Sequence, residues 1–397
     1  MSSSNSASAA LTVRPTADLQ YLQSQATSAS SSLRPLYARF PQLYEKKLWY
    51  QLTVAVEEFL NSKDSDAGTL RIDLYDKFVR GFSDKINQGR LVGIAVKAAR
   101  QLSDPAAANA FLSPLLPIVD TPSTQEAHVR AVMECAHFHL LQGQLQATKD
   151  SMDKCSKILD SLDAVDTETH AAYYRVSGDY YKAKADYAPY YRSSLLYLAC
   201  VDIHMDLTLE ERVERAHDLS ISALLGDTIY NFGELLLHPI LGDLESTPHA
   251  YLASLLNAFN SGSIGHFESL LPKLHNETIL KQNEPFLRQK ICLMALIESI
   301  FKRANDQRTL PFDTIAQETR LPSSEVEHLV MKALSLKLIK GTLDQHAQLA
   351  HVTWVQPRVL DKAQIKALQE RLDAWCQRVS QTAEFVKTET PELFASA

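Results

Sequence analysis

The residues most able to do chemistry are two histidines separated by a single residue. His137 and His139 are followed by Asp150, an order that resembles the zinc signature of a class of metalloproteases. Such a site needs two imidazoles and a carboxylate on zinc, together with a serine that supports the reacting oxygen. The serine position holds Ala147, and on one helix the two histidines would point about 200° apart. The sequence therefore disfavours a zinc protease and predicts that His139 packs in a core.

Acidic residues elsewhere follow patterns typical of a solvated surface. Glu210 and Glu211 stand where a helix begins, a position at which negative charge is favourable. Asp150 and Asp153 alternate with lysines at spacings of three and four residues, which is ordinary surface charge pairing. Phosphate-binding glycine loops and HExxH or GxSxG motifs are absent from the sequence. We predict no catalytic residue, no cofactor and no metal, and hence a protein that is not an enzyme.

Composition indicates an ordinary globular chain. Its 397 residues are long enough for two or three domains, and 45% of them are hydrophobic. The 12 glycines are too few to favour a dinucleotide-binding or glycine-rich β fold. A net charge of −7 provides no general attraction to nucleic acid or acidic membranes. The five scattered cysteines form no CxxC pair, as expected for reduced thiols in the cytoplasm or nucleus.

The first forty residues are rich in serine and alanine and predict a flexible tail at 1–40. Met1–Ala10 lacks the basic start and apolar stretch of a secretory signal. Scattered arginines with few acids give a faint likeness to a mitochondrial transit peptide, which the disordered tail explains better. No apolar run is long enough to cross a bilayer, so we expect no membrane contact.

Residues 41–285 read as a mainly α region of successive amphipathic helices. The apolar spacing predicts helices at Leu145–Leu162, Ala171–Lys184, Ala188–Met205 and Leu209–Leu225. They recur as hairpins at intervals of about 40 residues, which is typical of helical-repeat proteins. We predict a right-handed, tetratricopeptide-like solenoid, with its many tyrosines serving as packing residues.

Residues 286–358 predict a winged helix with a small β-hairpin. Asp313 can cap a short helix at Thr314–Thr319, and Ser324–Glu327 fits the capping box of a second helix. Leu338–Leu343 and Leu349–Val355 read as two strands joined by a polar turn. Along the second strand His351 and Thr353 alternate with Val352 and Trp354, as expected when one face is buried.

Winged helices often bind DNA, but the charges here do not favour it. Glu325 and Glu327 occupy the start of the second helix, where DNA contacts usually lie, while Lys332 and Lys337 come later. The module is neutral, so we expect no nucleic-acid partner. An exposed hairpin edge instead pairs readily with another chain. The residues predicted to contact a partner there are Lys340, Thr342, His351 and Thr353.

Residues 361–388 predict a long helix with one narrow apolar stripe, beginning at Asp361 as its N-cap. Alternating steps of three and four residues are typical of a coiled-coil interface held for about three heptads. Either the stripe packs on its own domain or it joins a bundle of helices from other subunits, and its length favours the bundle. The stripe comprises Ile365, Leu368, Leu372, Trp375, Val379, Thr382 and Val386, and we predict partner contacts at all of these except Thr382.

Four segments in order resemble a known family across roughly residues 40–388. They are Gly233–Pro239, Asn257–Gly262, Val330–Ser335 and Thr353–Leu360. They are similar to PCI-domain, non-ATPase subunits of the proteasome regulatory particle lid, of the type numbered nine in yeast and thirteen in mammals. A PCI subunit of a sister complex, the signalosome or a translation initiation factor, shares the same architecture and stays open as the alternative.

The resemblance implies a scaffold rather than a catalyst. Such subunits associate through adjacent winged helices and place their C-terminal helices in a shared bundle. The implied partners are a neighbouring PCI subunit and the MPN-domain deubiquitinase pair, within a hetero-oligomer.

Overall fold

The computed structural model describes residues 21–22, 24–25, 33–275, 277–303, 307–359 and 362–390. The chain divides after Asp202 into two compact units, each described by itself below. This division falls inside the region 41–285 that sequence predicts as one solenoid. The predicted flexible tail at 1–40 is wrong in the parts that are described. Residues 21–22 and 24–25 are helical with Leu22 buried, and α2 (Arg34–Glu45) buries Tyr37 and Phe40. The rest of the tail lies largely outside the described residues.

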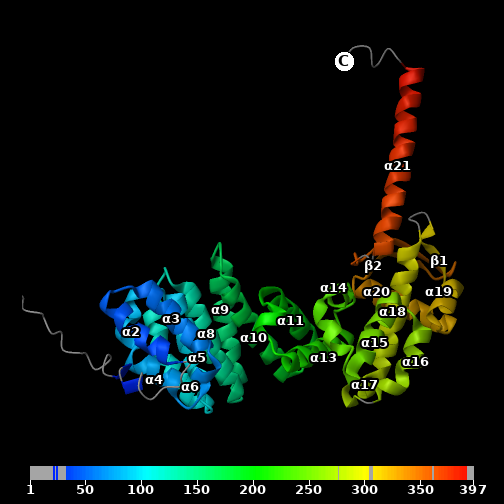
Figure 1. Ribbon diagram of the computed structural model, residues 1–397. Coiled ribbons are helices and arrows are strands. Elements are labelled where there is room, and N and C mark those ends of the chain that lie inside the picture. The colour runs from blue at the N-terminus through cyan, green and yellow to red at the C-terminus, as the bar shows by residue number, and fades with distance from the viewer. Residues whose placement is uncertain are drawn as a thin grey trace, which may run out of the picture. The chain divides into compact units, whose positions relative to one another are not determined.

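The first unit consists of helices throughout the residues that are described (Figure 1). Its elements are α2 (Arg34–Glu45), α3 (Trp49–Asn61), η1 (Lys63–Asp66), α4 (Leu70–Lys77), η2 (Val79–Lys85), α5 (Gln88–Ala99), α6 (Pro105–Leu112), η3 (Ser113–Leu115), α7 (Leu116–Val119), α8 (Gln125–Leu141), α9 (Leu145–Ser161), α10 (Thr167–Lys184) and α11 (Tyr187–Cys200).

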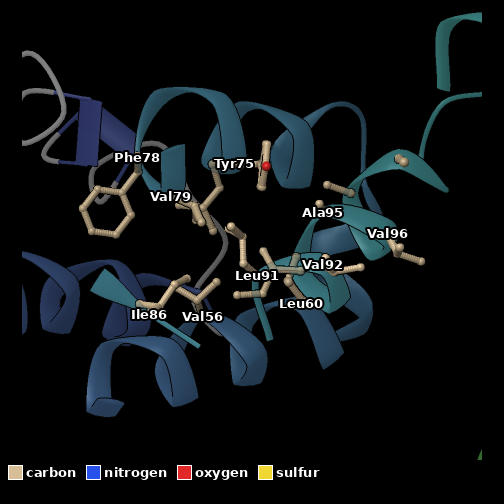
Figure 2. Packing of buried hydrophobic residues seen from close by; sticks show 14 of the residues in the cluster. Val56, Leu60, Tyr75, Phe78, Val79, Ile86, Leu91, Val92, Ala95 and Val96 are labelled. Carbon is tan, nitrogen blue, oxygen red and sulfur yellow. The ribbon is translucent and has the colours of Figure 1, made fainter. Parts of the chain in front are cut away.

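Aliphatic and aromatic side chains from α2 to α5 form the core of the first unit. Figure 2 shows Val56 and Leu60 of α3 facing Val79 of η2 and Leu91 of α5. Rings add directional contacts. The centroid of the Phe40 ring lies 5.9 Å from that of Phe78 in a stacked arrangement. This core holds helices α2 to α5 against one another.

The predicted helical hairpins are confirmed in α8 with α9 and α10 with α11, which pack as consecutive pairs. A buried carboxylate joins the pairs: Glu134 of α8 accepts hydrogen bonds from Arg100 Nε at 2.8 Å and from Arg175 Nη2 of α10 at 2.5 Å. Burial alone would raise the pKa of Glu134, but the charges of Arg175 and Arg100 outweigh it and hold that pKa below the ordinary value.

The second unit begins with a correction to one predicted helix. Ala188–Met205 is not continuous, because α11 ends at Cys200 and α12 starts afresh at Ile203, after extended backbone at Val201. The elements of the second unit are α12 (Ile203–Asp206), α13 (Leu209–Leu225), α14 (Gly233–Leu237), η4 (Pro239–Leu244), η5 (Pro248–Ala250), α15 (Tyr251–Ser261), α16 (Ile264–Leu274), α17 (Thr278–Gln282), α18 (Glu284–Lys302), β1 (Thr309–Pro311), α19 (Phe312–Thr319), α20 (Ser323–Ser335), β2 (Ile339–Asp344), β3 (Leu349–Val355) and α21 (Lys362–Glu389).

Helix α18 is the central element of this unit and carries an unusual buried cation. Lys290 is 1% exposed, and its Nζ donates to the carbonyl oxygens of Ala223 (2.8 Å), Leu224 (3.0 Å) and Gly226 (2.6 Å). These carbonyls lie at the end of α13, where helical carbonyls have no partner within the helix. Lys290 therefore fixes the end of α13 onto α18. The start of α13 is fixed by a capping box between Thr208 and Glu211.

The predicted winged helix is present, with three differences. Its sheet has a third strand, β1, which sequence analysis missed because three residues are too short for a periodic signal. Neither predicted cap forms: Asp313 lies inside α19, and α20 follows Pro322 with no side-chain cap. The carboxylate of Glu327 instead accepts from Gln345 Nε2 at 3.1 Å, across to the turn after β2. Each helix is instead preceded by a proline with extended backbone, Pro311 before α19 and Pro322 before α20.

Candidate partner-binding surfaces

The predicted apolar stripe of the C-terminal helix lies on α21 and is exposed along its whole length. Every side chain of α21 that the structure describes is exposed, including Ile365 at 54% and Trp375 at 63%. We call the stripe Ile365, Leu368, Leu372, Trp375, Val379, Thr382 and Val386 the α21 seam. Its residues fall on one side of the helix because steps of three and four average close to one helical turn of about 3.6 residues. The predicted N-cap, Asp361, lies outside the described residues.

One apolar residue beside the seam escaped the sequence analysis. Phe385 is 64% exposed and immediately precedes Val386. It was missed because it does not obey the alternating step, and in heptad terms it occupies the flanking g position. Two other g positions hold Arg371 and Arg378. The flank of the seam is therefore basic along its middle and aromatic at its end.

The sheet of the winged helix has the order β1-β3-β2, so β2 forms one edge. Lys340 and Thr342 lie on β2, and both side chains are exposed, as the hairpin-edge prediction requires. Lys340 Nζ lies 4.9 Å from the ring centroid of Trp354, a cation–π contact at the surface. This edge can accept a further strand.

The prediction for His351 and Thr353 is wrong in placement, because β3 is the central strand. His351 pairs with Thr309 of β1 on one side and Thr342 of β2 on the other. Its Nδ1 lies 2.9 Å from Thr309 Oγ1, while Thr353 Oγ1 donates to the carbonyl of Lys340. His351 is flanked by strands on both sides, and Thr353 lies on the central strand beyond the three residues that pair with β1.

The predicted alternation along β3 also fails at its end. Val352 is 7% exposed, as expected, but Trp354 is 37% exposed. The register shifts between Lys340 and Gly341, which leaves Thr353 as an extra residue on β3. A β-bulge of this kind reverses the side on which later residues point. Trp354 therefore contributes to the surface next to the β2 edge.

Arg358 fixes the segment that follows β3 to the helices beneath it. Its guanidinium donates to the Glu298 carboxylate of α18, and to the carbonyl and the side-chain Oδ1 of Asn260 in α15. The side chains of Arg358 and Glu298 are 8% and 10% exposed. Two helices and the exit from the winged helix thus meet at one buried ion pair, which positions the chain just before α21.

Three of the four family-like segments, Gly233–Pro239, Asn257–Gly262 and Thr353–Leu360, meet beside Arg358. Gly233 packs directly on the side chain of Val359, and a Cβ there would clash with it. Gly262 has φ +64°, and a Cβ on it would lie 2.8 Å from Ala295 Cα. A shallow pocket of about 320 Å³ is lined by Gly233, Asn257, Asn260, Glu298 and Arg358, among others. Sequence analysis found these segments but not their contact.

The candidate zinc-protease residues are not brought together. His137 Nδ1 lies 3.6 Å from Asp179 Oδ2, whereas His139 Nδ1 lies 2.9 Å from Gln144 Oε1. Asp150 accepts from Gln146 within its own helix. His139 is half-buried on α8 rather than enclosed in the core. The three side chains thus have three different partners, and the described residues do not gather them into one metal-ligand group.

Two further features bear on partners. Glu325 is exposed in the first turn of α20, where a DNA-binding winged helix would need a lysine or an arginine. The absence of a nucleic-acid partner stays a prediction. Within the described residues, no helix has the length and apolar character that a membrane span requires.

Paired helices followed by a winged helix define a PCI-type subunit, and two family models match accordingly. The model for PSD13 N-terminal repeats matches residues 36–256, and that for the PCI domain matches residues 268–354. The chain belongs to the family of 26S proteasome non-ATPase regulatory subunit 13, also called Rpn9.

The similarity to that family extends over nearly the whole chain. The Schizosaccharomyces pombe protein called probable 26S proteasome regulatory subunit rpn9 is 42% identical over 94% of this chain and 97% of its own length. Arabidopsis thaliana 26S proteasome non-ATPase regulatory subunit 13 homolog A is 39% identical over 96% of this chain and 100% of its own. Saccharomyces cerevisiae RPN9 is 38% identical over 88% of this chain and 92% of its own.

The alternative of a sister complex has weaker support. Eukaryotic translation initiation factor 3 subunit M from Aspergillus fumigatus is 26% identical, over only 45% of this chain and 40% of its own length. The proteasomal relatives cover about twice as much of the chain at higher identity, so this alternative is not favoured.

Proposed function

We propose that this chain is a non-catalytic structural subunit of the 26S proteasome regulatory particle lid, acting in the cytoplasm and nucleus. It supports ubiquitin-dependent degradation by holding other subunits in place. Full-length similarity to 26S proteasome regulatory subunits supports the assignment. The observation that carries the scaffold role is the α21 seam, which the chain itself leaves exposed.

The α21 seam supports a helical bundle with other subunits. An isolated helix of this kind is marginal in water, and burial of its apolar stripe is what stabilises it. Each large apolar side chain contributes about 1.5–3 kcal/mol when it becomes fully buried. Those of the seam begin half-exposed, so part of that free energy is still to be gained from a partner. The basic flank at Arg371 and Arg378 favours a partner helix with acidic residues at the facing positions.

The β2 edge supports a second contact, with the winged helix of an adjacent PCI subunit. An unpaired strand edge presents N–H and C=O groups in a row, and another strand satisfies them. Lys340 and Thr342 would flank that contact, with Trp354 on the adjoining surface. The MPN-domain deubiquitinase pair is the further partner that the family resemblance implies.

A double substitution on the α21 seam tests the proposal. Leu372→Asp with Trp375→Asp places two charges where apolar side chains would be buried. We expect the variant to keep its circular-dichroism spectrum but to disappear from lid-sized complexes on native gels. The matched control is Ala374→Asp with Gln377→Asp, which adds the same charges on the other side of the same helix turns.

A variant with the seam charges that still enters the lid as fully as wild type would overturn the bundle assignment. Copurification with a tagged copy separates the two complexes independently. Proteasomal ATPase subunits should copurify, whereas their absence together with initiation-factor subunits would favour the alternative. Tight nucleic-acid binding with a steep salt dependence would contradict the scaffold-only role.

A further inference from the structure

Three side chains of types that can bind a metal ion converge in the second unit, from separate elements. His217 lies on α13, His249 on η5, and Glu277 immediately before α17. Their nearest ligand atoms all lie within 4.8 Å of one another. His217 Nε2 is 3.1 Å from Glu277 Oε1, and His249 Nδ1 is 3.5 Å from the same oxygen. In the part of the chain that the structure describes, this is the one such group.

These separations match those of ligands around a tetrahedral zinc ion. Zinc lies about 2.0–2.1 Å from imidazole nitrogen and about 2.0–2.2 Å from carboxylate oxygen. Two ligands at the tetrahedral angle are then roughly 3.3 Å apart. That value falls between the 3.1 Å and 3.5 Å found here. Glu277 is therefore separated from each histidine as two ligands of one zinc ion would be, and the ligand atoms of the two histidines lie within 4.8 Å of each other.

Asp218 holds His217 in an orientation that suits metal binding. His217 Nδ1 lies 3.4 Å from Asp218 Oδ1, and a proton on Nδ1 would leave the lone pair of Nε2, which now contacts Glu277 Oε1, to face a metal. A carboxylate behind a histidine is the arrangement that orients zinc-bound imidazoles in proteins.

The polar contacts of the other two ligand atoms lie within the group itself. His249 Nδ1 is buried and makes no hydrogen bond, although a buried polar atom normally has a partner. Glu277 occupies the N-cap of α17 without capping it, because its carboxylate turns to the two histidines. Among the described residues, no lysine or arginine forms an ion pair with Glu277. A cation at this point would satisfy both groups.

We propose that His217, His249 and Glu277 form a zinc site, with a water molecule as the fourth ligand. Two imidazoles and one carboxylate are a ligand set that zinc uses with three protein ligands. Calcium and magnesium prefer oxygen ligands throughout, so the two nitrogens argue against them. The site joins three segments that are separated in the sequence, and a bound ion would tie η5 and the start of α17 to α13.

Cobalt and zinc titration of the purified full-length chain tests the site. After treatment with a chelator, Co²⁺ should bind in one equivalent and give the intense visible bands of four-coordinate cobalt, which Zn²⁺ then removes. Zinc should also raise the melting temperature, because it binds the folded state only. We expect His249→Ala to weaken zinc binding by at least about 100-fold, since changes even to residues behind the ligands cost about 10–100-fold.

His275→Ala is the matched control, because His275 also faces a carboxylate, Glu284 at 3.5 Å, without a third ligand. It should leave zinc binding unchanged. Should His249→Ala not fold, Glu277→Gln provides the same test while keeping the shape of the side chain. Weak octahedral cobalt bands alone, or equal zinc affinity in His249→Ala, Glu277→Gln and the control, would overturn the proposal.

Discussion

Helices α18 and α21 are both long and amphipathic and belong to the same unit, yet α18 is largely buried and α21 is exposed. α18 buries eleven residues, among them Leu287, Ile291 and Met294, whereas α21 buries none that the structure describes. Their apolar stripes differ in width: α18 is apolar around most of its second half, while α21 has a narrow seam bordered by charges. A wide stripe needs several neighbours and packs in a core, whereas a narrow one fits a single partner helix.

The largest effect that would sharpen this comparison is expected at Lys290 in α18. Lys290→Met removes three hydrogen bonds from carbonyls at the end of α13, among which Gly226 keeps only a long contact of 3.4 Å from the N–H of Ile229. Buried acceptors that lose a donor cost about 1–3 kcal/mol each, and relief of the buried charge offsets part of the loss. We expect a loss of about 3–5 kcal/mol in the free energy of unfolding, measured by urea denaturation.

The control for Lys290 is Lys332→Met, which makes the same change at an exposed position of α20. It should alter stability by less than about 0.5 kcal/mol. Equal small effects in both variants would show that α18 does not depend on its buried cation.

The second largest effect is expected at Arg358, because it fixes the segment between β3 and α21 to α15 and α18. Arg358→Ala leaves Glu298 buried with only Lys302, whose Nζ lies 3.4 Å from it. Loss of one partner of a buried pair costs about 3–5 kcal/mol, and the remaining lysine reduces this to about 2–4 kcal/mol. Thermal unfolding should detect it as a clear fall in melting temperature.

Arg320→Ala provides the comparison for Arg358, since Arg320 pairs with Glu268 at 2.7 Å in an exposed position. Surface pairs contribute about 0–1 kcal/mol. If the two arginine variants lost the same stability, the buried junction before α21 would have no special role.

A smaller effect is expected in the first unit, where Glu134 provides a pH-dependent comparison. Its pKa in the folded state lies below the ordinary value of 4.5, so its contribution to stability is present above that pH. The contribution is lost as pH falls through the folded pKa. Between pH 5 and pH 3 the stability of Glu134→Gln should fall less than that of wild type, by about 1–2 kcal/mol. Parallel curves would contradict this role.

The smallest effect should come from the α21 seam itself when the chain is alone. Leu372→Ala removes a side chain that is 53% exposed. The unfolding free energy of each unit, measured by urea denaturation of the isolated chain, should therefore change by less than about 0.5 kcal/mol. A loss above about 2 kcal/mol, which is typical of truncating a buried leucine, would mean that the seam packs on its own unit. That result would break the comparison with α18.

Sequence periodicity predicted the long elements well, and local geometry limited the rest. Leu209–Leu225 was predicted with both ends correct, because a capping residue and a long apolar stripe agree there. The break at Val201 was missed, since the apolar pattern continues across it. β1 and the bulge at Gly341 depend on pairing with a distant strand, which no local spacing reveals.

The candidate surfaces divide in the same way. The α21 seam could be predicted because a heptad repeat depends only on neighbouring turns. His351 and Thr353 were predicted at an edge because the sequence indicated only two strands. The third strand, β1, makes β3 the central strand. The cluster of His217, His249 and Glu277 has no sequence signature, because its members come from three segments brought together by tertiary packing.

The strand order β1-β3-β2 also limits how many neighbours the sheet can have. β1 has only three residues and ends at Pro311, which has no N–H to donate, so that side offers little to an incoming strand. Only the β2 side remains, and the module is in effect monovalent: strand pairing could join it to one neighbour. A module that binds two neighbours at once therefore needs a second, chemically different joint.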